Sequence, residues 1–269
     1  MEMAVNFEKH SFNKRLKTML SVDFRRMFTM PFFYIMAGIS LVIPILVLVM
    51  TTMMDGSVSV NPQTGEETVI EAFDSAWQAI GSISGEGAML DMSLTGMCNI
   101  NLIYFMISVL VCCFVADDFR SGYSKNLFTV RAKKTDYVIS KTLVCFVGGV
   151  SMILAFFIGT VLGGAIAGLP FDMGAASAGS IVMCMIAKAL LVAVFVAIYL
   201  LASVIAKQKL WLSILLSLMV GMFLFTMIPM LTPLTANIMN VILCLAGGAL
   251  FGVGLGAISC AVLKKRDLL

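Results

Sequence analysis

Six apolar runs without an acidic residue are the feature that most constrains what this chain can fold into. A helix needs about 20 apolar residues to cross a bilayer, and the runs are of about that length. The runs are Phe32–Met50, Cys98–Ala116, the stretch after Lys141 as far as Leu169, Ala189–Ala206, Leu210–Met230 and Ile238–Leu263. Only 12% of the residues are charged, about half the usual share in a soluble domain. The pattern predicts an all-α integral membrane protein: one transmembrane domain over residues 1–269, with six transmembrane helices.

Lys188 lies inside the apolar stretch 181–206 and decides where the fourth span is placed. A lysine at the centre of a transmembrane helix costs about 2.5–3.5 kcal/mol, whereas each Leu or Val gains only about 0.3–0.6 kcal/mol. We therefore place the span at Ala189–Ala206 and Lys188 at the outer boundary, where its long side chain can reach the headgroups. The helix itself is expected to begin earlier, near Ala175.

Basic residues are confined to alternate segments between the predicted spans. Of the 18 Lys and Arg residues, all except Lys188 fall before the first span, between the second and third, between the fourth and fifth, or after the sixth. The segment 52–96 contains acids but no Lys or Arg. Because basic loops stay in the cytoplasm, both termini are predicted to be cytoplasmic and 52–96 to be extracellular. The first apolar run starts after about 30 residues, so no cleaved signal peptide is expected.

Residues 8–30 are predicted to form a cytoplasmic amphipathic helix at the membrane interface. Apolar residues recur in three- and four-residue steps, so they share one helix face, and most of the basic residues lie on the other. The apolar face consists of Phe12, Leu16, Met19, Leu20, Phe24, Met27 and Phe28. Such a helix lies flat on a membrane with its basic side chains at anionic headgroups. The sequence leaves open whether it is only an anchor or also contacts a soluble partner.

The two longest segments between spans each contain a helix signal. In 52–96, Thr68 and Glu71 match a capping box, and an apolar face follows that consists of Ile70, Phe73, Ala76, Trp77 and Ile80. This helix is expected to cap the bundle or lie on the outer leaflet, with a substrate-handling role as the alternative.

In the segment 117–140, Asp117 can cap a short helix with Phe119, Tyr123 and Leu127 on one face, interrupted by Gly122 and by the charges of 131–136. Two interpretations stay open for this segment. It is either a solvated cytoplasmic turn or a coupling loop that transmits motion from a soluble subunit to the second and third spans.

Several kinds of chemistry are absent from the sequence. There is no G-x-x-x-x-G-K-[ST] phosphate loop and no H-E-x-x-H motif, and the single histidine is His10. No Asp or Glu lies inside a predicted span, which argues against a proton-coupled carrier. The basic residues follow the membrane rather than forming a groove, so nucleic acid is not an expected partner. The cysteines are interpreted as small packing residues.

Glycines at four-residue spacing indicate close helix contacts. They are Gly159 and Gly163, Gly164 and Gly168, and the series Gly248, Gly252 and Gly256. Packing inside the bundle is the expected role, and a dimer interface is the alternative. Asn99 and Asn101, at the outer end of the second span, are polar candidates for substrate contact, although solvation of a helix end is the simpler interpretation.

The segments after the second span and at the C-terminus resemble those of permease subunits of ABC-2-type exporters. These permeases show an acidic pair, a Gly and a Lys-x-Leu-like step, which read here as Asp117-Asp118, Gly122 and Lys125-Asn126-Leu127. A basic turn over Arg131–Lys141 then leads into the third helix. The end of the chain, Lys265-Arg266-Asp267-Leu268, matches a phrase common at the family's C-terminus. Tyr123 stands where the family usually has Thr.

The resemblance implies a permease that performs no chemistry itself and carries no cofactor. ATP and Mg²⁺ would be held by separate ABC ATPase subunits, and two permease chains, identical or related, would form the pathway. The compact form is similar to bacterial plasma-membrane exporters of antimicrobial peptides, drugs or lipid-like molecules. The resemblance places the ATPase contact on Asp117, Asp118, Phe119, Arg120, Gly122, Tyr123, Lys125 and Leu127, together with the N-terminal helix. The alternative is a membrane scaffold or a channel that works without nucleotide.

Overall fold

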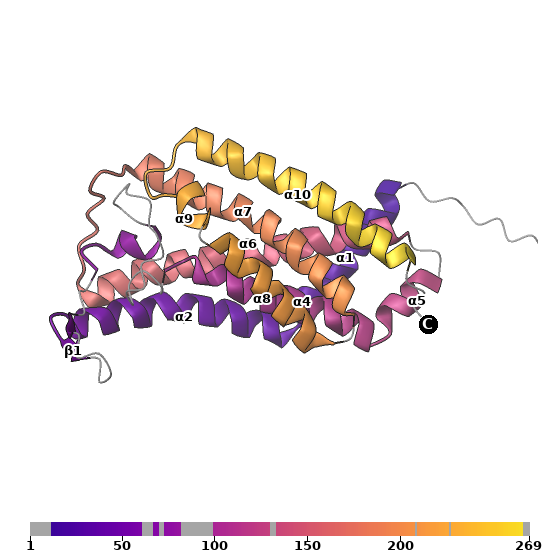
Figure 1. Ribbon diagram of the computed structural model, residues 1–269, viewed down its shortest axis with the longest axis horizontal. Coiled ribbons are helices and arrows are strands. Elements are labelled where there is room, and N and C mark those ends of the chain that lie inside the picture. The colour runs from indigo at the N-terminus through magenta and orange to yellow at the C-terminus, as the bar shows by residue number, and fades with distance from the viewer. Residues whose placement is uncertain are drawn as a thin grey trace, which may run out of the picture.

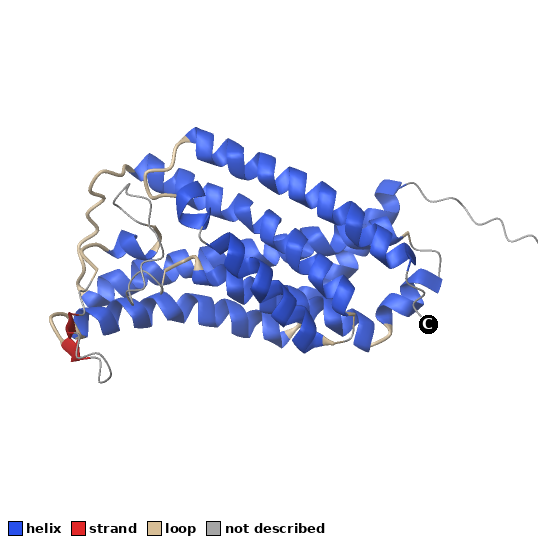
Figure 2. Ribbon diagram, viewed as in Figure 1, coloured by secondary structure: helices blue, strands red, loops and turns tan. Residues whose placement is uncertain are grey.

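The computed structural model is a bundle of long helices that run roughly side by side, with a short hairpin and short helices at the ends (Figures 1 and 2). It describes residues 12–60, 67–69, 73–81, 99–129, 133–207, 209–225 and 227–265. The helices are α1 (Phe12–Thr29), α2 (Pro31–Met53), α4 (Leu102–Arg120), α5 (Tyr123–Thr129), α6 (Lys134–Ala167), α7 (Ala178–Ala206), α8 (Leu210–Phe225), α9 (Met227–Leu231) and α10 (Ile238–Lys265), with a 3₁₀ helix, η1, at Ala76–Ala79. Strands β1 (Val58–Val60) and β2 (Glu67–Val69) form an antiparallel pair.

Five of these helices are long and apolar enough to cross a membrane: α2, α4, α6, α7 and α10. They confirm the multi-pass membrane prediction and five of the six expected spans. Within the predicted fifth span, Leu210–Met230, the structure describes α8, which has 16 residues, and the five-residue α9; the residue between them lies outside the described part of the chain. A sixth crossing therefore stays a prediction.

Pro31 separates the first two helices. A residue before proline is pushed away from the helical conformation, and Met30 is extended, with φ −79° and ψ 117°. Pro31 then starts α2 at a position where its missing N–H costs nothing. The break allows α1 to leave the direction of α2 and pack against the beginning of α6.

Glycines on α6 allow α2 to pack very closely against it. A Cβ added to Gly159 would lie 2.2 Å from the carbonyl oxygen of Leu41, and one added to Gly163 would lie 2.8 Å from the Cα of Ile45. The first glycine pair therefore packs inside the bundle, as expected. Gly168 does not pack; it ends α6 in the left-handed conformation, with φ +69°.

The glycines of α10 behave differently from one another. Gly248 approaches α7, where an added Cβ would lie 3.2 Å from the Cβ of Ala193, whereas Gly252 has no atom within 4 Å of such a Cβ. Most of α10 beyond its contact with α7 is exposed. The alternative of a dimer interface on this helix is untested by the single chain.

Apart from Lys188, the basic residues that the structure describes gather at one end of the bundle, which we call the basic end. It is formed by α1, α5, the first turns of α6, the connection between α7 and α8 that carries Lys209, and the last turn of α10 (Figure 1). The Nζ of Lys134 donates to the carbonyl oxygen of Leu263 there, which ties α6 to α10. The hairpin, η1 and the 168–177 loop lie at the opposite, far end. This segregation is the one that the sequence predicted, but which end faces the cytoplasm stays a prediction.

At the far end, the predicted capping box at Thr68 is wrong. Thr68 lies in β2 and pairs with Ser59 of β1, so it does not start a helix; Ile70 and Glu71 lie outside the described residues. Ser75 is the residue that caps a helix, because its hydroxyl accepts from the Trp77 N–H at the start of η1.

The short helix η1 nevertheless covers the bundle, as expected. Ala76, Ala79 and Ile80 are fully buried. The Trp77 Nε1–H donates to the carbonyl oxygen of Phe171 (3.2 Å), which joins η1 to the loop after α6.

Candidate functional site

The segment 117–140 is mostly helical, which corrects the expected loop. Asp117 does not cap a new helix, because α4 continues to Arg120. Gly122 then reverses the chain with φ +73°, and α5 begins at Tyr123. The third long helix starts at Lys134, about two turns before Lys141. Asp118 and Lys141 are consequently held inside helices at the basic end.

The buried stripe of α1 is only partly the apolar face predicted for it. Met19, Asp23 and Met27 are its buried residues, at four-residue spacing. Leu16, Leu20 and Phe24 are half-buried, whereas Phe12 and Phe28 are exposed. An acid therefore occupies the centre of the stripe that faces the bundle, and the position of α1 at a membrane interface stays a prediction.

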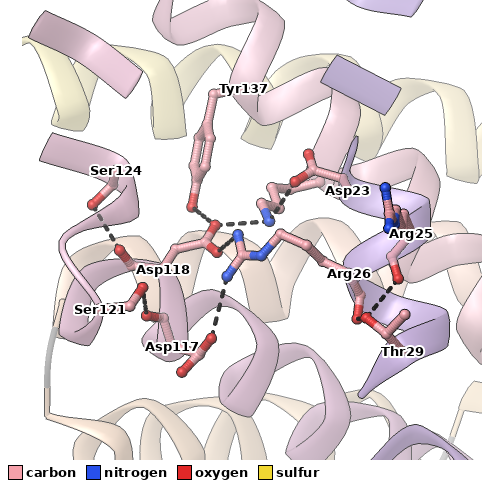
Figure 3. A network of polar contacts seen from close by, with 10 residues as sticks. Asp23, Arg25, Arg26, Thr29, Asp117, Asp118, Ser121, Ser124 and Tyr137 are labelled. Atoms are coloured by element: carbon pink, nitrogen blue, oxygen red, sulfur yellow. Dashed lines mark hydrogen bonds and ion pairs between the residues drawn. The ribbon is translucent and has the colours of Figure 1, made fainter. Parts of the chain in front are cut away.

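Asp23 of α1 and Asp118 of α4 both pair with Lys141 of α6. The Lys141 Nζ lies 2.9 Å from the Asp23 Oδ1 and 2.7 Å from the Asp118 Oδ2. All three side chains are fully buried. Ser140 donates to the other oxygen of Asp23 (2.6 Å) and the Tyr137 hydroxyl donates to Asp118 (2.9 Å). These contacts join three helices through one buried network (Figure 3).

Arg26 connects this network to the surface. One guanidinium nitrogen lies 2.5 Å from the Asp118 Oδ1 and the other 3.2 Å from the Asp117 Oδ2. The ring of Tyr123 stacks on the guanidinium, with the Cζ 4.2 Å from the ring centroid. Such cation–π contacts add about 0.5–2 kcal/mol. They fix α5 beside α1.

Burial and charge act in opposite directions on these two side chains. For Arg26 burial disfavours the charged form, but the attraction of Asp118 and its hydrogen bond outweigh burial and raise the pKa. For Tyr123 burial is the main effect and raises the pKa of the phenol, with support from Asp23 and Asp118 and opposition from Arg26. Arg26 is therefore a permanent cation and Tyr123 a neutral ring at physiological pH.

We call the set Asp23, Arg26, Asp117, Asp118, Tyr123, Tyr137, Ser140 and Lys141 the basic-end network. It holds two cations and three carboxylates; because Asp117 is exposed, the two buried carboxylates, Asp23 and Asp118, are matched by Lys141 and Arg26. Removing one partner of a buried ion pair costs about 3–5 kcal/mol, because the other charge is left uncompensated. The network therefore holds α1, α4 and α6 in one arrangement.

The residues that the resemblance singled out fall into three groups. The exposed residues are Asp117, Arg120 and Lys125, the half-buried ones are Gly122, Tyr123 and Leu127, and the buried ones are Asp118 and Phe119. Asp117, Asp118 and Tyr123 are brought together by Arg26. The structure does not test whether any of the eight contacts an ATPase.

A small pocket opens beside the network. Its volume is about 170 Å³, and its lining residues are Arg26, Thr29, Met30, Phe114 and Asp117. The pocket lies between α1 and α4, so a side chain of a bound partner would contact both helices there.

Asp23, Arg26, Tyr137 and Lys141 were not predicted as site residues. For Asp23 a signal was present, since it lies four residues from both Met19 and Met27 on the apolar face. For Lys141 the apolar run that follows it suggested a helix start instead. Its carboxylate partners come from distant parts of the chain, and no local pattern predicts that pairing.

Lys188 is a second correction. Its side chain does not reach out toward headgroups but is fully buried, whereas its depth in the membrane stays a prediction. Its Nζ donates to the Asn101 Oδ1 (3.0 Å) and to the Thr232 Oγ1 (2.9 Å). Asn101 is buried as well, so solvation of a helix end does not describe it, while Asn99 accepts from the Asn101 N–H. The expectation that the helix extends well before Lys188 is correct, since α7 begins at Ala178.

The described residues offer no metal centre, since no three His, Cys, Asp or Glu side chains among them are placed to hold an ion. The basic-end network is thus a set of ion pairs between helices.

Comparison with known protein families gives a match that covers most of the chain. The family model described as ABC-2 family transporter protein matches residues 24–224. The chain belongs to the ABC-2 transporter family. No curated protein and no solved structure matches it significantly. The match runs from the second half of α1 almost to the end of α8 and so includes the basic-end network except Asp23, which lies one residue before it.

Membership fixes the general role of the chain. ABC-2 proteins of this kind are the membrane subunits of ABC transporters, and their ATP hydrolysis takes place on a separate ATPase. The predicted permease is thereby confirmed at the level of the family. In this ABC-2 permease the basic-end network is the best-connected set of buried charges among the described residues.

Proposed function

We propose that this ABC-2 permease is half of an ATP-driven bacterial exporter and that ATPase subunits bind at its basic end. In this proposal the basic end is cytoplasmic, and a second permease chain, identical or related, completes the pathway. The cargo is an amphipathic or hydrophobic molecule of the class of antimicrobial peptides, drugs or lipid-like molecules. The apolar helices, with no described acidic side chain in the middle of the bundle, favour such a cargo over a small hydrophilic ion.

One observation carries the proposal: buried ion pairs join α1, α4 and α6 directly behind the exposed surface of α5. Lys141 lies within 2.9 Å of Asp23 and within 2.7 Å of Asp118. A force applied to α1 or α5 would therefore move three helices together rather than bend one loop.

The connection between α5 and α4 explains how such a force would be transmitted. The Ser124 hydroxyl of α5 donates to the carbonyl oxygen of Asp118 (3.2 Å), and the Tyr123 ring covers Arg26. Because α5 follows α4 after only Ser121 and Gly122, a displacement of α5 acts on the last turn of α4. From there the ion pairs of Asp118 carry it to α1 and α6.

Exposure divides the residues into two roles. Asp117, Arg120 and Lys125 are exposed and are the ones that we assign to ATPase contact. Asp118 is fully buried and acts inside the network as a positioning residue. Basic residues on the exposed side of α1, such as Lys14, Lys17 and Arg25, would contact anionic lipid or the same partner.

The test is ATPase stimulation in a reconstituted complex. The permease should co-purify with a soluble subunit that carries a phosphate loop, and cargo should stimulate its ATP hydrolysis. The double variant Arg120→Ala with Lys125→Ala should lose most of this stimulation while it stays folded. The control, Lys209→Ala with Lys265→Ala, removes two exposed charges of the basic end outside α4 and α5 and should keep it.

Two results would contradict the proposal. One is full stimulation in the Arg120/Lys125 variant. The other is cargo transport by the reconstituted permease without any ATPase subunit.

A further inference from the structure

Lys188 is a buried amine whose only hydrogen-bond partners among the described residues are neutral. The Asn101 Oδ1 and the Thr232 Oγ1 lie 3.0 and 2.9 Å from its Nζ, and its side chain has no exposed surface. A lysine ammonium has three N–H groups, so one donor remains after these two contacts. An ionisable group at membrane depth is costly and usually functional.

The second fully buried lysine of the chain provides an internal comparison. Lys141 lies between two carboxylates at 2.9 and 2.7 Å. No carboxylate of the described residues forms an ion pair with Lys188. The charge of Lys141 is thus balanced by two carboxylates, whereas Lys188 donates, within the described part of the chain, only to the neutral side chains of Asn101 and Thr232. Among these residues Lys188 lacks a negatively charged partner such as those that Lys141 has in the basic-end network.

Lys188 also lies inside the helix bundle rather than at its surface. It is ten residues into α7, which starts at Ala178, so it is about 15 Å along the helix from the far end. Its two acceptors belong to element ends: Asn101 immediately precedes α4 and Thr232 immediately follows α9. Element ends are the positions at which helices can separate without breaking their own hydrogen bonds.

We propose that Lys188 binds the anionic head group, phosphate or carboxylate, of the exported amphiphile. The anion replaces Asn101 and Thr232 as the acceptor and supplies the charge that the site lacks. Charge-assisted hydrogen bonds of this kind are about twice as strong as neutral ones. The identification of the ligand as a cargo rests on the proposed export function. The test of anion binding at Lys188 needs neither the ATPase nor transport.

The experiment measures ligand binding to the purified permease in dodecyl maltoside. The probes are dodecyl phosphate and laurate, with dodecanol as the uncharged comparison, and the readout is the dissociation constant obtained from thermal-shift titration. Wild type should bind one or both anions at least about tenfold more tightly than dodecanol. Which anion binds distinguishes a phosphate from a carboxylate cargo.

Three variants locate the site. Lys188→Met, which keeps the length of the side chain, should lose the tenfold preference. Lys209→Met, which removes an exposed lysine, should keep it. Thr232→Val removes a competing acceptor and should tighten anion binding, which a purely structural lysine would not do.

The inference is wrong if wild type binds the anions no better than dodecanol. It is equally wrong if Lys188→Met binds them as wild type does, or, should that variant not fold, if Thr232→Val leaves the affinity unchanged. Because ATPase stimulation is measured separately, the proposed function can survive any of these results.

Discussion

At the scale of the residue, neighbouring acids of the same kind have different roles because of their burial. Asp117 and Asp118 both contact Arg26, but the Asp117 side chain is 55% exposed and that of Asp118 is not exposed at all. Exposed ion pairs contribute about 0–1 kcal/mol, whereas a broken buried pair costs about 3–5 kcal/mol. Burial, rather than the presence of a charge, therefore identifies the residue that holds the helices together.

This contrast gives the first prediction. Asp118→Asn should lower the free energy of unfolding by about 3 kcal/mol or more, because Lys141 and Arg26 each lose a charged partner. Asp117→Asn, the matched control one residue away, should lower it by less than about 1 kcal/mol. Denaturant titration of both variants in detergent measures the difference. Equal effects would mean that the buried network does not stabilise the basic end.

Tyr123 gives a prediction for alkaline pH. Burial raises the pKa of its phenol in the folded chain above the ordinary value of about 10. The folded state thus holds the proton more tightly than the unfolded state. The protonated Tyr123 phenol therefore contributes fully to the free energy of unfolding below about pH 10, and this contribution is lost as the pH rises through the pKa of the folded chain.

Thermal unfolding of Tyr123→Phe, followed between about pH 9 and 11, tests that sign. The variant should lose stability less steeply than wild type above about pH 10. Tyr34→Phe, which removes an exposed phenol, is the matched control. If stability declined identically with pH in wild type and in Tyr123→Phe, the Tyr123 phenol would not contribute to the pH dependence of stability.

At the scale of the element, two glycines of the same spacing motif differ in what surrounds them. Gly159→Ala would place a Cβ 2.2 Å from the Leu41 carbonyl oxygen, so α2 must move away and stability should fall by about 1–3 kcal/mol or more. Gly252→Ala meets no atom within 4 Å and should be neutral or stabilising by up to about 1 kcal/mol. Unfolding in detergent compares the two. A tolerated Gly159→Ala would rule out the close contact of α2 and α6.

The positions of the long helices could be predicted from hydropathy, since bilayer thickness sets their length. Their ends could not, because α4 and α6 extend beyond the apolar runs through Asp118 and from Lys134 onwards. Hydropathy treats such polar residues as loop, whereas in the structure their charges are paired with one another. The same limitation gave Lys188 a side chain that reaches the headgroups, whereas it is buried against Asn101 and Thr232, which lie far away along the chain. Thr68 was misplaced because a capping box is a local pattern, and pairing with Ser59 overrides it.

At the scale of the whole molecule, charge divides the bundle into two ends with different roles. The basic end contains the network that joins α1, α4 and α6 and presents Arg120 and Lys125 at its surface. The far end contains the hairpin and η1, and Lys188 lies between the two ends with neutral partners. In our account the ATPase moves the helices at the basic end, and Lys188 binds the head group of the cargo further along the bundle.

Site-specific photo-crosslinking in cells that also contain the ATPase subunit tests this account most directly. A photoreactive amino acid at Lys125 of the basic end should crosslink the ATPase, and the same amino acid at Asp172 of the far end should not. Both positions are exposed, so accessibility alone does not separate them. Crosslinking from Asp172, or its absence from Lys125 in a complex that hydrolyses ATP, would contradict the claim that the basic end receives the ATPase.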